Sequence, residues 1–497
     1  MNVQCKLLIA AFLALMLLSP FMSILANAEN DGFTLEAEQN WDTYGVGGTC
    51  VFGTHNIFVA DVDGDGAMEI LTGGFSYNTV NGTRFASQAP LKVWGWNGQN
   101  ITLKTSTNWN GNIYCLYAAD LDGDGVVEII TAGSFRNQTG NSTTALRIWQ
   151  MKNGELSLKA HYEGASIASL FVADVDNDGA QEILSVGRLY SEIRNSSQLC
   201  LWKYSDSTLS LYKNASLASA NVTSANSVYA SDLNNDGTQE IIIGGYAGEL
   251  ADSKGQLSLW QWRGQELGLL ANQQWQLVEG LTAKTIAGGT QGNTAVYNVK
   301  AGDLDGDGKK EVVTGGFAYD GEQVNAQIKV WRWDGDALME KASQEWATDY
   351  LTEVKCVTLN DVDGDGKTDI VVSGITAAEG SFNNPEAAHD RGQLRVWGFD
   401  GAALVLKYST EWSFDDGSCA WNVGSGDVDN DGVVEMITIG CSALGNLCDP
   451  DMRIWSLPQT EAFPTYIVYV VAVVLIASGT SVFVLMVYKR RKSKVML

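Results

Sequence analysis

Seven short acidic segments carry the residue types and spacing of a cation site. Each is nine residues long, with an oxygen-bearing side chain at positions one, three, five and nine, and glycine at position six, where a sharp turn is needed. Position seven varies, as expected if only its backbone carbonyl is used. The oxygen-bearing residues are Asp61, Asp63, Asp65 and Glu69; Asp120, Asp122, Asp124 and Glu128; Asp174, Asp176, Asp178 and Glu182; Asp232, Asn234, Asp236 and Glu240; Asp303, Asp305, Asp307 and Glu311; Asp361, Asp363, Asp365 and Asp369; and Asp427, Asp429, Asp431 and Glu435.

The ligand types favour calcium. Calcium takes hard oxygen ligands, whereas softer transition metals prefer His or Cys, and the seven segments contain neither. An EF-hand loop places its bidentate glutamate at position twelve between helices, which does not fit this spacing. The alternative is an acidic turn without metal, but three or four carboxylates in one turn repel each other unless a cation is present. The sequence therefore predicts up to seven calcium ions with a structural role.

The acidic segments are positioned by a repeated set of short strands. An apolar run such as "NIFVAD" enters the segment, and a second run such as "EILTGG" leaves it. A third run such as "LKVWGW" and a fourth such as "ITLKTSTNW" follow, separated by a tight turn. Alternating β-branched and aromatic residues are typical of strands. Four strands in each of seven repeats predict an all-β, seven-bladed β-propeller over residues 33–457, with the strand that enters each segment innermost.

Two further features fit this architecture. The last repeat lacks a fourth run, and residues 34–41 ("TLEAEQNW") resemble one, so we expect the N-terminal strand to complete the last blade and leave no open sheet edge. Of the 16 tryptophans, 15 lie in third or fourth strands. This recurrence favours packing between blades over a ligand site.

The repeats resemble the FG-GAP/VCBS repeat family, which includes the propeller of integrin alpha subunits. The resemblance rests on the pattern "ADVDGDG..EILTGG" and covers most of residues 33–457. It implies the propeller fold and calcium in the acidic loops. It implies little about function, since family members bind proteins, bind glycans or carry other domains. Six of the seven loops have Glu at position nine where the family usually has Asp, and no inserted integrin-type domain is visible.

The two ends predict export and a membrane anchor. Residues 1–28 combine an early lysine, a long apolar run and an Ala-Asn-Ala ending, as in a signal peptide; an N-terminal membrane anchor is the alternative. After a linker at 458–465, residues 466–488 carry no charge and are long enough to cross a bilayer, with a buried helix as the alternative. The basic tail at 489–497 favours the cytoplasmic side. We expect a single-pass plasma-membrane protein with the propeller outside.

The charge distribution restricts the partners. Of the 32 basic residues, one lies in the predicted signal peptide and five in the tail, so 26 basic residues face 58 acidic residues in the outer domain, a net charge of −32. A surface this acidic excludes nucleic acid as a probable partner class. The basic tail could contact anionic lipid or lie beside a membrane-protein partner of the helix.

Partner recognition is expected on the long loops opposite the calcium loops, because a rigid scaffold displays binding residues on such loops. The candidate ligand-binding residues are Tyr246, Phe317, Tyr319, Phe382, His389 and Arg391. The alternative is that these are ordinary loop residues without a binding role. Sequons in the first half would shield that side if glycosylated. They are Asn81, Asn100, Asn137, Asn141, Asn195, Asn214 and Asn221.

Seven cysteines remain after removal of the predicted signal peptide. Cys441 and Cys448 share one loop and could pair, and Cys50 and Cys419 lie at comparable places in blades one and seven. An odd count leaves at least one thiol, for which Cys200 is a candidate.

The favoured function is a calcium-stabilised, membrane-anchored extracellular binding or adhesion module for a surface protein or glycan. Alternatives are a structural cell-envelope component or an accessory subunit of a membrane complex, for which Gly479 among small residues could allow close helix contact. An enzyme is less favoured: the three histidines show no catalytic spacing, and no phosphate loop or dinucleotide fingerprint is present. A hydrolase or lyase on a propeller remains a further alternative.

Overall fold

A computed structural model describes residues 32–459 except for 41–53, 76–78, 81–82, 85–87, 137–141, 165–166, 190–195, 218–223, 250–251, 265, 280–292, 379–389, 414–416 and 445–446. The described part is all-β, as the alternating sequence patterns predict. None of its residues belongs to a helix long and apolar enough to cross a membrane. The predicted signal peptide at 1–28 and the predicted span at 466–488 lie outside the described residues.

The strands fall into seven repeats of four, numbered in chain order. Their bounds are β1 (Thr34–Asn40), β2 (Thr54–Ala60), β3 (Glu69–Gly74), β4 (Thr79–Val80), β5 (Thr83–Arg84), β6 (Gln88–Trp96), β7 (Ile101–Ala119), β8 (Glu128–Arg136), β9 (Ser142–Lys152), β10 (Glu155–Glu163), β11 (Ser169–Ala173), β12 (Glu182–Leu189), β13 (Ser196–Ser205), β14 (Thr208–Ser216), β15 (Ser224–Ser231), β16 (Glu240–Ala247), β17 (Lys254–Arg263), β18 (Glu266–Trp275), β19 (Thr294–Gly302), β20 (Glu311–Tyr319), β21 (Val324–Trp333), β22 (Leu338–Trp346), β23 (Leu351–Asn360), β24 (Asp369–Ala377), β25 (Arg391–Phe399), β26 (Leu404–Trp412), β27 (Ser418–Gly426), β28 (Glu435–Leu444) and β29 (Leu447–Ser456).

Each repeat is an antiparallel sheet whose strands pair in chain order. Repeat 1 contains β2, β3, β6 and the first half of β7, and repeat 2 contains the second half of β7 with β8, β9 and β10. Repeats 3, 4, 5 and 6 contain β11–β14, β15–β18, β19–β22 and β23–β26. Repeat 7 contains β27, β28, β29 and β1. The short hairpin of β4 and β5 lies within the repeat 1 connection.

The continuous strand β7 joins repeats 1 and 2. It pairs with β6 as far as Asn110 and with β8 from Gly111 onward. At Gly111 φ is 152°, and a Cβ atom there would lie 2.0 Å from the carbonyl oxygen of Ser134. Only glycine can therefore occupy the position where the strand changes partner.

The N-terminal strand completes the last repeat. β1 pairs antiparallel with β29 from Thr34 opposite Ser456 to Asn40 opposite Asp451. This pairing confirms the prediction that residues near the N-terminus supply the missing fourth strand. The first and last described strands are thus held in one sheet, in which β29 is paired on both sides by β28 and β1.

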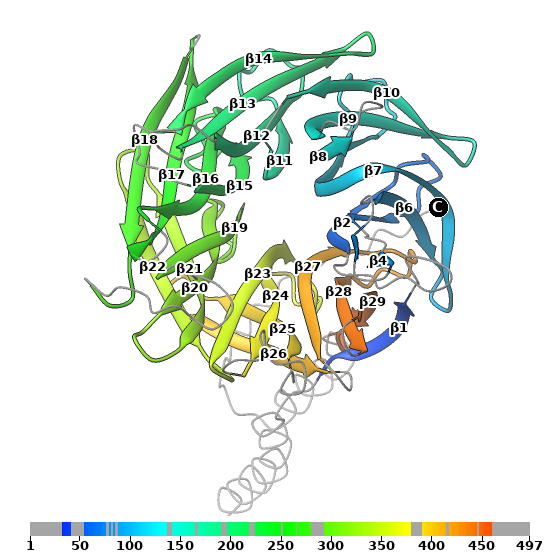
Figure 1. Cartoon of the computed structure of the whole chain (residues 1–497). Helices are drawn as coiled ribbons and strands as arrows, with labels where there is room; N and C mark the ends of the chain where they lie inside the picture. The colour runs from blue at the N-terminus through cyan, green and yellow to red at the C-terminus, as the bar shows by residue number, and fades with distance from the viewer. Residues whose placement is uncertain are drawn as a thin grey trace, which may run out of the picture. The chain divides into compact units, whose positions relative to one another are not determined.

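The first strands of the repeats contact each other in sequence. β2, β7, β11, β15, β19, β23 and β27 each contact the next, and β27 contacts β2 again. Figure 1 shows these strands facing the middle of the arrangement, with the second, third and fourth strands of each repeat following outward. Each first strand ends where its acidic segment begins, as predicted. The seven acidic segments therefore lie at equivalent places.

Tryptophans hold neighbouring repeats together, which confirms their predicted packing role. A fourth-strand ring lies against the third-strand ring of the next repeat in several pairs, with centroids 5.0–5.3 Å apart: Trp109 with Trp149, Trp275 with Trp331, Trp346 with Trp397, and Trp412 with Trp455. Third-strand indoles also donate to a second-strand hydroxyl, as Trp94 Nε1 does to Thr72 Oγ1 at 2.9 Å. The ring contacts fix neighbouring repeats against one another, and the hydrogen bonds hold each indole within its own repeat.

Candidate metal centres

The seven acidic segments form seven loops of one design. Loops 1 to 7 begin at Asp61, Asp120, Asp174, Asp232, Asp303, Asp361 and Asp427 and connect the first and second strands of their repeats. In every loop the position-one carboxylate accepts a hydrogen bond from the N–H of the glycine at position six, at 2.8–3.0 Å. The position-five carboxylate accepts from the N–H of position seven, at 2.8–2.9 Å. The backbone thereby turns the loop carboxylates toward one another.

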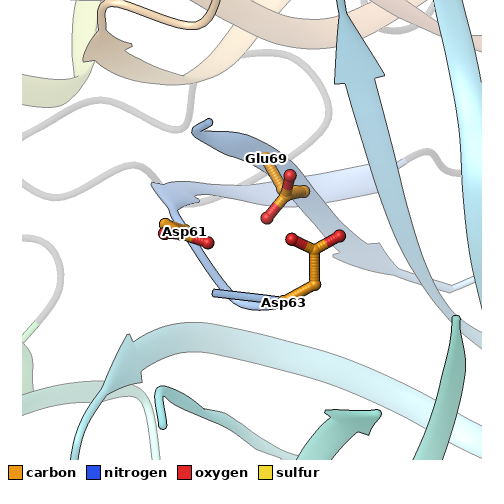
Figure 2. A group of neighbouring side chains, drawn as sticks. All are labelled: Asp61, Asp63 and Glu69. Carbon is orange, nitrogen blue, oxygen red and sulfur yellow. The ribbon is translucent and has the colours of Figure 1, made fainter. Parts of the chain in front are cut away.

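The acid at position nine is the last and most deeply buried carboxylate of each loop. It is the first residue of the second strand and at most 2% exposed in every loop. One of its oxygens accepts a hydrogen bond from the N–H of position two, at 2.9–3.2 Å. In loops 1, 2, 3 and 5 an oxygen of this acid lies within 4.8 Å of carboxylate oxygens at positions one and three. Figure 2 shows this in loop 1, where the carboxylates of Asp61, Asp63 and Glu69 point into a common space.

The donor set fits a hard divalent cation. In loops 1, 2, 3, 5 and 6, oxygens from three carboxylates lie within 4.8 Å of one another. The residues that would hold calcium are those at positions one, three, five and nine, together with the backbone carbonyl of position seven. All of them are hard oxygen donors, which calcium prefers. Bound calcium would offset two negative charges of the loop and stabilise the folded state.

Basic side chains in four loops were missed by sequence reasoning. Lys104 Nζ lies 3.0 Å from Asp63 and 2.5 Å from Glu69 in loop 1. Equivalent ion pairs join Lys203 to loop 3, Arg332 to loop 5 and Lys407 to loop 6. In these four loops the chain therefore supplies a cation of its own beside the carboxylates.

In the sequence, the residue that follows the third-strand tryptophan indicates which loops form these ion pairs. It is Lys203 in repeat 3 and Arg332 in repeat 5, and each enters the loop directly. In repeats 1 and 6 it is Gly95 or Gly398, and a lysine of the fourth strand crosses above it. A Cβ at Gly95 would lie 3.2 Å from Lys104 Cε, so glycine provides room for the lysine stem.

Loops 2, 4 and 7 lack such a cation among the described residues, and their position-nine acids resist ionisation. Burial, with the neighbouring aspartates adding to it, raises the pKa of Glu128 to about 7, of Glu240 to about 7 and of Glu435 to about 8. In loop 1, burial of Lys104 disfavours its charge, but hydrogen bonds to Glu69 and Asp63 outweigh this and raise its pKa. Loops 2, 4 and 7 are consequently the loops in which an added cation would meet no basic side chain of the described residues in its place.

The predicted ligand-binding residues do not form one exposed site. Tyr246, Phe317 and Tyr319 are at most 9% exposed and pack in one apolar cluster, because their strand ends face the neighbouring repeat. This burial is at odds with the predicted role in direct ligand contact. Arg391 is half-buried, with Nε 3.1 Å from Glu411. Phe382 and His389 lie outside the described residues.

The structure brings together two cysteines that belong to different predicted pairs. Cys419 and Cys441 lie opposite each other on β27 and β28, with their sulfur atoms 2.7 Å apart. The predicted partners were Cys50, which lies outside the described residues, and Cys448, for which only the backbone is described. Cys200 is buried as a free thiol, in line with its predicted unpaired state.

Two of the predicted glycosylation sites fall in the described part of the chain. Asn100 and Asn214 are both exposed, so a glycan could be attached at either one. The other predicted sites lie outside the described residues: Asn81, Asn137, Asn141, Asn195 and Asn221.

Comparison with known proteins identifies one repeat. Residues 303–372 match the model of the FG-GAP-like repeat, a stretch that contains loops 5 and 6. No curated protein matches the chain.

Proposed function

The chain carries an FG-GAP-like repeat at residues 303–372, and from this premise we propose a function. We propose that this protein is a calcium-stabilised, seven-bladed β-propeller that acts as a membrane-anchored extracellular binding module. Its partner would be a surface protein or glycan. FG-GAP repeats occur in extracellular proteins of the adhesion type, which supports this class. The apolar segment at 466–488 and the signal-like segment at 1–28 support export and anchoring.

The observation that carries the proposal is the set of three backbone hydrogen bonds to carboxylates that all seven loops share. A turn that directs its carboxylates toward one another and recurs in all seven repeats has the form of a repeated cation site. Bound cations of this kind would keep the scaffold of a binding module rigid. With calcium at ~1 mM and a Kd near ~0.1 mM, each occupied loop would add about 1.4 kcal/mol to the free energy of unfolding.

Calcium binding is tested first, by isothermal titration and thermal unfolding of the full chain. We expect at least three ions per chain, one in each loop without a basic side chain, and a fall in the melting temperature when a chelator is added. Glu128→Gln should remove one ion, whereas Gln150→Glu, which adds a carboxylate beside the same loop, should not. Failure to bind any calcium would refute the metal part of the proposal.

Partner recognition is tested by screening the same chain against arrays of glycans and cell-surface proteins, in calcium and in chelator. A hit lost on chelation would support the binding module and identify its partner class. A folded, calcium-loaded chain without a hit would favour a structural or complex-subunit role.

A further inference from the structure

The first strands of all seven repeats line a cavity of about 390 Å³. This volume lies in the range of about 300–1,000 Å³ that small-molecule sites occupy. The cavity involves neither the acidic loops nor the long outer loops, so an inference about it does not depend on the function proposed above.

Aromatic side chains line part of the cavity wall. The residue three positions before each loop's first aspartate is aromatic in the first four repeats, and ring centroids of successive repeats lie 4.2–5.4 Å apart. Of these four rings, Phe58 and Tyr117 line the cavity, and Phe171 and Tyr229 continue the row beside it. In the fifth repeat the row ends on a lysine whose Nζ lies 5.2 Å from the last ring centroid. The corresponding residues of the sixth and seventh repeats are smaller than these rings. The series is Phe58, Tyr117, Phe171, Tyr229, Lys300, Thr358 and Gly424.

The cavity is positively charged in a strongly acidic chain. Its described lining contains Lys300 and Lys355 and no Asp or Glu. Lys355 is neutralised by an ion pair with Glu353 and lies over the rings of Tyr297 and Trp421. No carboxylate of the described residues lies within 4.0 Å of Lys300 Nζ, and burial lowers the pKa of this amine. An anionic ligand would supply the partner that Lys300 lacks.

Two amide side chains of the lining also lack hydrogen-bond partners. Asn56 is 9% exposed, and its Nδ2 donates to no atom of the described residues. Asn298 Oδ1 is buried and accepts from none. A buried polar atom without a partner costs free energy, so a ligand that brings both an acceptor and a donor would be favoured here.

We propose that this cavity binds an acidic sugar, with its carboxylate at Lys300, its hydroxyl groups at Asn56 and Asn298, and its apolar ring face against Phe58 and Tyr117. A carboxylate satisfies the amine. Hydroxyl groups both donate and accept, as the two amides require. The aromatic wall and the space beside Thr358 and Gly424 accommodate a ring-shaped body.

The test measures binding of glucuronate, glucose and acetate to the full chain by isothermal titration. Glucose lacks the carboxylate and acetate lacks the hydroxylated ring, so both should bind at least tenfold more weakly than glucuronate. Lys300→Met should weaken glucuronate binding at least tenfold, and Lys159→Met, which removes an exposed lysine of repeat 2, should leave it unchanged.

A second variant keeps the test decisive if Lys300→Met fails to fold. Thr358→Phe extends the aromatic row into the cavity and retains the amine, and it should abolish glucuronate binding while the loops still bind calcium. The proposal is overturned if glucose binds as tightly as glucuronate, if acetate binds as tightly, or if either folded variant binds glucuronate like the wild type. Calcium titration of the same samples shows separately whether the loop sites are intact.

Discussion

Lys92 shows how a single buried charge is accommodated in this chain. It lies two residues before Trp94 in the third strand of repeat 1, with Nζ 5.1 Å from that ring centroid. Basic residues at the same position in later repeats lie over a tryptophan of the preceding repeat, as Arg395 does over Trp346 at 5.2 Å. Burial lowers the pKa of Lys92 to about 8, so the folded state disfavours its charged form.

Replacing Lys92 tests the free-energy cost of burying its charged amine. Because the pKa of Lys92 is lower in the folded chain than its usual 10.5, the wild type should gain stability as pH rises from 8 to 10.5. Lys92→Met should be more stable than the wild type at pH 7.5, and the difference should shrink by pH 10. Urea denaturation followed by tryptophan fluorescence measures both, with Lys159→Met as the control. A difference that stays constant over this range would contradict the assignment.

The second prediction at this scale concerns Cys419 and Cys441. Their opposed positions and short sulfur separation predict a disulfide in an oxidising compartment. Non-reducing peptide mapping should recover the two peptides linked, and removing both thiols should lower the free energy of unfolding by about 3 kcal/mol. Recovery of Cys419 as an alkylated free thiol from unreduced protein would show that the pair is not bridged.

At the scale of the loop, one design is used in two electrostatic forms. Loops 1, 3, 5 and 6 hold a basic side chain among their carboxylates, and loops 2, 4 and 7 do not, within the described residues. Adjacent loops are also tied together, as where Asn235 Nδ2 donates to the carbonyl of Gly308 in the next loop at 2.8 Å. Occupancy of one loop should therefore influence the order of the next.

Loop 3 offers a direct test of competition between lysine and calcium. Lys203 Nζ contacts Asp176, Asp178 and Glu182, and calcium must displace it to reach the same oxygens. Lys203→Met should bind calcium at loop 3 about tenfold more tightly, which corresponds to about 1.4 kcal/mol, and should melt at a lower temperature when metal-free. Lys159→Met, whose amine contacts only Gln150 at 3.1 Å, serves as the control in calcium titration. Unchanged affinity would mean that the lysine does not compete.

At the scale of the whole domain, stability depends on pairing the first strand with the last. Ala37 of β1 packs against the apolar cluster between repeats 7 and 1, which contains Ile437 and Ile454. The closure joins residues more than 400 positions apart, so its loss would release both ends of the sheet series.

Ala37→Asp tests this closure. A carboxylate placed against the cluster should lower the free energy of unfolding by about 2–3 kcal/mol. Thr34→Asp, at the exposed start of the same strand, should change it by less than about 0.5 kcal/mol. Chemical denaturation of the two variants gives the comparison. Equal stability would show that β1 contributes little to holding the domain closed.

Sequence reasoning predicted what local patterns encode. Alternating residues identified the strands, the recurring turn identified the loops, and the missing fourth run in the last repeat identified β1 as its substitute. The lysine in loop 1 could not be predicted this way, because Lys104 meets Glu69 only through the register between β3, β6 and β7. The burial of Tyr246 depends likewise on how one repeat packs against the next, which no periodicity within a strand reveals.

The continuity of β7 across two repeats limits where an additional domain can be inserted into this protein. A guest domain is accommodated where the chain leaves one sheet and enters another through a turn. Between repeats 1 and 2 the chain passes straight from one sheet into the next, with Asn110 paired in the first sheet and Gly111 paired in the second. An insertion at this junction would have to sever a strand that two sheets share, so chain growth is confined to the other connections.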